Sequence, residues 1–100
     1  MTSETLKIKV IHGDTFRVEC IVRDYDKSLM DPDSHAIKLL KPDGTQQGTT
    51  YTNPTRKALG EYYQHIPIPA DGVAGDWMVE WTITESGENT TERIRVPVVL

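Results

Sequence analysis

Residues 76–84 constrain the fold of this chain more than any other segment. One face of this run is apolar and holds, in order, Trp77, Val79, Trp81 and Ile83. The other face is polar apart from Met78. A period of two over nine residues is typical of a β-strand that is buried on one face only. The chain is therefore expected to be a packed antiparallel β protein.

Similar alternation recurs along the chain at spacings of roughly ten residues. It predicts further strands over 6–10, 15–23, 36–41, 61–68 and 91–99, and a short polar edge strand near 48–52. Turns are predicted at 12–14, 41–44, 70–75 and 85–90, loops at 24–34 and after residue 52, and fraying over 1–5. No segment has the 3.6-residue period of a helix. Short strands at this spacing predict one antiparallel β-sandwich domain of seven or eight strands over residues 1–100.

The alternation also predicts which side chains face the interior. Cys20 is the only cysteine, so it cannot form an internal disulfide, and its place in an alternating strand predicts a small buried residue. The register of 61–68 stays open, because placing Tyr62, Ile66 and Ile68 inside also places Gln64 inside. The predicted core consists of Leu6, Ile8, Val10, Phe16, Val18, Cys20, Val22, Ile37, Leu39, Tyr62, Ile66, Trp77, Val79, Trp81, Ile83, Ile94 and Val96.

Composition argues against two classes of partner. The formal net charge of −4 opposes general attraction to nucleic-acid phosphate, so no nucleic-acid partner is expected. No apolar run approaches the roughly 18 residues that span a bilayer, so no membrane partner is expected either. The first ten residues do not have the basic and apolar regions of a secretory signal.

The motifs of common active sites and metal sites do not occur in the sequence. His12, His35 and His65 lack the spacing of zinc ligands, and there is no nucleophile elbow or phosphate-binding loop. We therefore predict no catalytic, cofactor-binding or metal-binding residues. The acidic loop from Asp24 to Asp33 leaves two alternatives open, a calcium site or carboxylates that cap local turns.

The aromatic residues present a second choice. Tyr62, Tyr63, Trp77 and Trp81 could line a sugar-binding face. Both tryptophans share the inward face of their strand, which favours core packing instead. Tyr63 is the one that the pattern places toward solvent.

Three segments resemble a known group of domains. They are the Lys41-Pro42-Asp43-Gly44-Thr45 turn, Gly60-Glu61-Tyr62, and Gly75-Asp76-Trp77-Met78-Val79. Together they are similar to the small immunoglobulin-like sandwich domains of bacteria and phages. Such domains occur among phage and prophage structural proteins, and as modules in large surface proteins and macroglobulin-like chains. The antibody pattern is missing, because residues 77–83 contain no cysteine and Leu39 stands where an antibody domain has tryptophan.

The resemblance implies a non-catalytic structural or interaction module, in the first instance a phage or prophage virion component. The alternatives are a module of a larger bacterial surface or adhesion protein that binds protein or glycan, and a small calcium- or ligand-binding protein. Expected partners are proteins, such as virion proteins, bound through loops or a strand edge within residues 45–59. The expected location is the cytoplasm or a virion, or outside the cell for a surface-protein fragment. The oligomeric state is not predicted.

Overall fold

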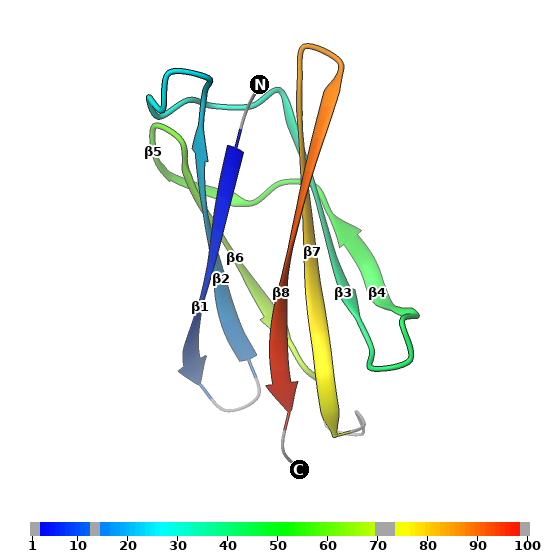
Figure 1. Ribbon diagram of the computed structural model, residues 1–100. Coiled ribbons are helices and arrows are strands. Elements are labelled where there is room, and N and C mark those ends of the chain that lie inside the picture. The colour runs from blue at the N-terminus through cyan, green and yellow to red at the C-terminus, as the bar shows by residue number, and fades with distance from the viewer. Residues whose placement is uncertain (1–2, 13–14, 70–73, 99–100) are drawn as a thin grey trace.

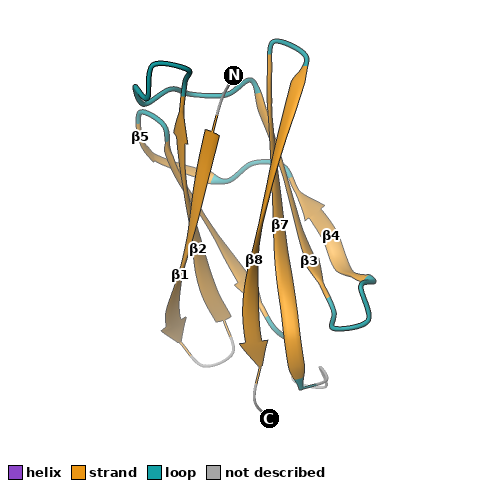
Figure 2. Cartoon of the chain, viewed as in Figure 1, coloured by secondary structure: helices purple, strands orange, loops and turns teal. Residues whose placement is uncertain are grey.

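The structure is a computed structural model that describes residues 3–12, 15–69 and 74–98, and within the first strand the side chains of Thr5 and Leu6. The regular elements of these residues are all β-strands, which confirms the predicted all-β class (Figures 1 and 2). They are β1 (Ser3–His12), β2 (Thr15–Arg23), β3 (Ser34–Leu40), β4 (Gln46–Tyr51), β5 (Thr55–Ala58), β6 (Glu61–Pro67), β7 (Gly75–Glu85) and β8 (Glu88–Val98).

The strands form two four-stranded sheets. The first sheet has the order β1-β2-β6-β5, the second has the order β4-β3-β7-β8, and all pairs are antiparallel. An immunoglobulin sandwich pairs its strands A-B-E-D and C-F-G, so this order is compatible with that fold plus one extra edge strand, β4. The domain is elongated, with extents of 42 × 24 × 19 Å. β1 starts at one end of the long axis and β8 finishes at the other (Figure 1).

The interior between the sheets contains the predicted apolar faces. Trp77 and Trp81 are 1% and 0% exposed, which confirms that both indoles belong to the core. Tyr62, Ile66 and Ile68 are buried and Gln64 is half-buried, which settles the register of β6. Leu6 and Ile94, two of the predicted core residues, are only partly buried against this core. The side chains of Ile8 and Val10 lie outside the described part.

Three local predictions were wrong. Residues 3–5 were expected to fray, but they belong to β1, where Ser3 pairs with Arg23. Residues 55–58 were expected in a loop, but they form β5, which pairs with β6 although it lacks an alternating pattern. The bend at 85–90 is only two residues long. Ser86 and Gly87 have φ of 52° and 80°, as a type I′ hairpin turn requires, so β7 and β8 extend further than predicted.

The turn between β3 and β4 was predicted correctly. Gly44 has φ of 90°, and its N–H donates to the Lys41 carbonyl at 2.9 Å. The Asp43 carboxylate accepts from the Thr45 N–H at 2.9 Å, as a turn aspartate commonly does. β4 confirms the polar edge strand predicted near 48–52. The predicted turns at 12–14 and 70–75 fall largely outside the described residues.

Within residues 3–12, 15–69 and 74–98, no helix is long and apolar enough to cross a bilayer.

Candidate functional site

The loop of residues 24–33 lies across one end of the sandwich. At this end β1, β3, β6 and β8 begin, and β2, β5 and β7 finish. We call this surface, made by residues 24–33, 59–60 and 86–87, the N-terminal end. Two carboxylates of the loop bond to different sheets, because Asp31 contacts the turn before β6 and Asp33 accepts from the Ser86 N–H at 3.0 Å. The loop therefore ties the two sheets together.

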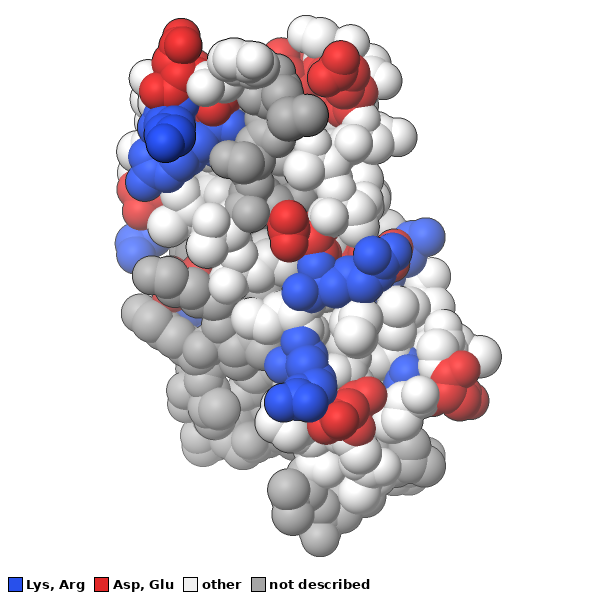
Figure 3. Space-filling view, in the orientation of Figure 1, with Lys and Arg blue, Asp and Glu red and all other residues white. Residues whose placement is uncertain are grey.

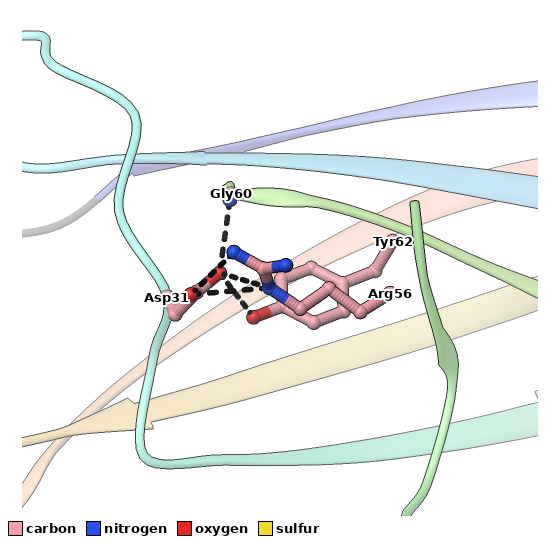
Figure 4. A network of polar contacts seen from close by, with 4 residues as sticks. All are labelled: Asp31, Arg56, Gly60 and Tyr62. Carbon is pink, nitrogen blue, oxygen red and sulfur yellow. Dashed lines mark hydrogen bonds and ion pairs between the residues drawn. The ribbon is translucent and has the colours of Figure 1, made fainter. Parts of the chain in front are cut away.

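Asp31 is the centre of this connection (Figure 4). Its Oδ1 accepts hydrogen bonds from the Gly60 N–H at 2.9 Å and from the Tyr62 hydroxyl at 2.6 Å. Arg56 Nε lies 3.2 Å from both carboxylate oxygens, and Arg56 Nη2 lies 3.1 Å from Oδ2. The carboxylate thus receives donors from β5, from the turn and from β6. Charge-assisted hydrogen bonds of this kind are stronger than neutral ones.

The protonation states of this cluster follow from its contacts. The hydrogen bond from Arg56, followed by those from Tyr62 and Gly60, holds the pKa of the Asp31 carboxyl well below its usual 3.8. Burial, together with the hydrogen bond to Asp31, raises the pKa of Tyr62 to about 12. Near neutral pH the cluster therefore consists of an ionised acceptor and neutral or cationic donors. Its chemistry suits holding two segments together rather than transferring protons.

Replacing Asp31 by alanine is expected to lower the free energy of unfolding by about 2–3 kcal/mol. The substitution leaves the Gly60 N–H and the Tyr62 hydroxyl without their acceptor. The figure allows for solvent screening, because the Asp31 and Arg56 side chains are 38% and 53% exposed. Urea unfolding measures the change. Asp26→Ala, an exposed carboxylate in the same loop, is the control and is expected to change stability by less than about 0.5 kcal/mol. Equal effects of the two substitutions contradict the role of Asp31.

His35 connects the cluster to the core. Its Nδ1 accepts a hydrogen bond from the Trp81 indole N–H at 3.2 Å, so the neutral ring carries its proton on Nε2. The His35 ring packs against Tyr62 with centroids 4.3 Å apart. Burial lowers the pKa of His35 from 6.5, and the Asp31 charge opposes this shift. Protonation of Nδ1 would remove the acceptor of the buried indole N–H.

These shifts predict two separate pH windows of stability. Because the pKa of His35 is lowered, the folded protein takes up this proton less readily than the unfolded chain, so stability is expected to fall as the pH drops below about 6.5. Asp31 acts in a lower pH range. Its contribution is present above about pH 4 and is lost as the pH falls below it, because only the unfolded carboxyl readily takes up a proton there.

Urea unfolding across this pH range checks both windows. His35→Phe is expected to remove the loss of stability that begins below about pH 6.5, and Asp31→Ala the loss that begins below about pH 4. If the free energy of unfolding of the parent and of both variants changes with pH in the same way, apart from a constant difference, the assignment of the two windows to His35 and Asp31 is wrong.

Asp24 caps a local turn within the loop. Asp24 Oδ1 accepts from the N–H groups of Asp26 and Ser28 at 2.9 and 3.0 Å. Of the two alternatives for this loop, the structure shows turn capping. In the described part of the chain no three His, Cys, Asp or Glu side chains gather closely enough to hold a metal ion. The side chain of His12 is outside that part.

Tyr62, Tyr63, Trp77 and Trp81 do not line one exposed face. Trp77, Trp81 and Tyr62 belong to the core. Tyr63, expected to face solvent, is half-buried, because the guanidinium carbon of Arg17 lies 3.8 Å from its ring centroid. This cation–π contact covers the ring on the outer face of the first sheet.

Two large apolar side chains are exposed among the described residues, Tyr25 at 79% and Leu59 at 49%. Both belong to the N-terminal end. Sequence reasoning did not single out these residues, nor the cluster of Asp31, Arg56 and Tyr62. Arg56 and Tyr62 lie 25 and 31 positions from Asp31, a separation at which a local pattern carries no signal.

Comparison with known proteins gives one partial likeness. No protein-family model and no solved structure matches the chain. Two curated relatives, both called Alpha-2-macroglobulin, come from Xylella fastidiosa strains 9a5c and Temecula1 / ATCC 700964. They are 28% and 27% identical to this chain over 86 residues. The match covers 86% of this chain but spans 5% of the length of each relative. The chain is therefore similar to a small segment of a much larger protein.

Proposed function

We propose that this chain is a non-catalytic interaction module that works as one domain of a larger protein. The observation that carries the proposal is the likeness to the Xylella fastidiosa Alpha-2-macroglobulins, in which 86% of this chain corresponds to 5% of the relative. The β-sandwich fold supports the proposal as well. The matched segment has the length of a whole domain, so it corresponds to one folded unit of the larger protein.

The surface supports a binding role at the loops. Apolar side chains fill the interior, whereas Tyr25 and Leu59 are presented to solvent on loops held by hydrogen bonds. Tyrosine is among the residues that contribute most to protein interfaces, and loops on a rigid scaffold commonly bind partners. The expected partner is therefore another protein surface.

The virion role is the other candidate from the sequence. It rests on the resemblance to phage domains alone, whereas the curated relatives support the module of a larger protein. The two functions predict different gene arrangements, so the arrangement of the natural gene distinguishes them.

The natural reading frame and its neighbours test the proposal. A frame that encodes further β-sandwich modules beside these residues supports it. A separate gene of this length among capsid and tail genes contradicts it and supports the virion role. A separate gene within a metabolic operon contradicts both.

A further inference from the structure

The N-terminal end combines exposed apolar side chains with fixed loops. Tyr25 lies in a tight loop in which the Asp24 N–H donates to the Ser28 carbonyl at 2.9 Å and the Lys27 N–H to the Asp24 carbonyl at 3.0 Å. Arg23 adds a hydrogen bond from Nη1 to the Lys27 carbonyl at 3.0 Å. The exposed ring is thus carried by a loop whose backbone is already ordered, which reduces the entropy lost on binding.

The second exposed residue is joined to the same loop. Leu59 precedes Gly60, whose carbonyl accepts from the Val22 N–H at 2.8 Å. The Met30 N–H donates to the Val22 carbonyl at 3.1 Å, and Asp31 holds the Gly60 N–H. Both apolar residues therefore belong to one connected unit of backbone.

The charge of this end limits its partners. Figure 3 shows acidic side chains on both sides at the top of the view. The carboxylates in the loop, at its borders and in the adjoining turns outnumber the cations there: Asp24, Asp26, Asp31, Asp33, Glu85 and Glu88 against Arg23, Lys27 and Arg56. A partner surface that complements this end therefore carries basic side chains around an apolar centre.

The direction of the chain indicates which partner reaches this surface. β1 starts at the N-terminal end, and β8 finishes at the opposite end of a 42 Å long axis (Figure 1). A module joined ahead of β1 is therefore held next to Tyr25 and Leu59. Such a tether raises the effective concentration of the partner, so a small contact area suffices.

We propose that the N-terminal end is the docking surface for the module that precedes this one in the longer chain, with Tyr25 and Leu59 as its apolar anchors. This proposal rests on the proposed function. The docking face of the preceding module is expected to have an apolar depression surrounded by Lys and Arg.

The test uses the two adjoining modules as the natural reading frame encodes them. Nitrogen-15 relaxation reports whether the modules tumble as one body, and the rate of protease cleavage between them reports the undocked fraction. The double variant Tyr25→Ser/Leu59→Ser is expected to be cleaved at least about tenfold faster than the parent. The matched control is Gln46→Ser, an exposed position at the start of β4, expected to be cleaved at the parental rate.

Folding of the variants is checked on the 100-residue chain alone. Because both side chains are exposed, the melting temperature of the double variant is expected to lie within a few degrees of the parent value. Surface substitutions typically change stability this little. A large loss of melting temperature there contradicts the description of these residues as surface anchors.

The outcomes separate the two proposals. A frame that encodes no further module on either side contradicts the proposed function. A frame whose further modules all follow this one contradicts the docking proposal alone. A preceding module that tumbles independently of this one contradicts the docking proposal and leaves the proposed function in place. Modules that dock equally well in the parent and the double variant contradict the assignment of Tyr25 and Leu59. Docking that the double variant loosens and Gln46→Ser does not supports the proposal.

Discussion

Truncating Trp81 to alanine is expected to lower the free energy of unfolding by about 3–5 kcal/mol. The side chain is 0% exposed, so the substitution leaves a cavity the size of an indole between the sheets. It also removes the N–H donor from His35 Nδ1. Domains of this kind are stable by about 5–15 kcal/mol, so the loss is a large share of the total. Urea unfolding followed by circular dichroism measures it.

Two further variants separate the causes. Trp81→Phe keeps most of the buried apolar volume but lacks the N–H, and is expected to cost about 1–2 kcal/mol. Tyr25→Ala truncates an aromatic ring that is 79% exposed, and is expected to cost less than about 0.5 kcal/mol. If Trp81→Ala unfolds at the same urea concentration as Tyr25→Ala, the assignment of Trp81 to the core is wrong.

Replacing Gly60 by alanine is expected to cost about 2–5 kcal/mol. Gly60 has φ of 71°, a left-handed conformation that residues with a Cβ adopt at a cost of about 1–2 kcal/mol. An added Cβ would also lie 2.7 Å from the Val22 carbonyl oxygen and 2.9 Å from the Met30 nitrogen. These are backbone atoms of hydrogen-bonded segments, so they cannot move aside without disturbing the connection between β2, the loop and β6.

Gly44 provides the matched control for Gly60. It has φ of 90°, but nothing lies within 4 Å of an added Cβ. Gly44→Ala is therefore expected to show the conformational cost alone, about 1–2 kcal/mol. The difference between the two variants, measured by urea unfolding, is the cost of the close approach at Gly60. Equal costs would contradict that close approach.

The residues that these stability predictions concern also order the proposed docking surface. Asp31 and Gly60 hold the loop against the turn before β6, and Asp33 holds it against the turn before β8. A surface that docks another module needs its anchors in fixed positions. The polar cluster at this end therefore supports binding by ordering the loops that present Tyr25 and Leu59.

Much of the fold was predictable because burial on one face of a strand leaves a period of two in the chain itself. The inward positions of β2 and β7 show this most clearly, since Phe16, Val18, Cys20 and Val22, and Trp77, Val79, Trp81 and Ile83, are all buried. The turn at 41–45 was equally legible, because proline and glycine restrict or permit backbone conformations whatever surrounds them. β5 was missed because an edge strand of four residues, three of them polar, has no apolar face to alternate.

The alternating pattern and the turn residues were sufficient to define an all-β chain, most of its strands and their inward faces, because these depend on near neighbours in the sequence. The connection from Asp31 to Arg56 and Tyr62, and the exposure of Tyr25 and Leu59 on the same end, came only from the folded molecule. Contacts between residues so far apart depend on how two sheets pack and where their loops meet. No local periodicity records that arrangement.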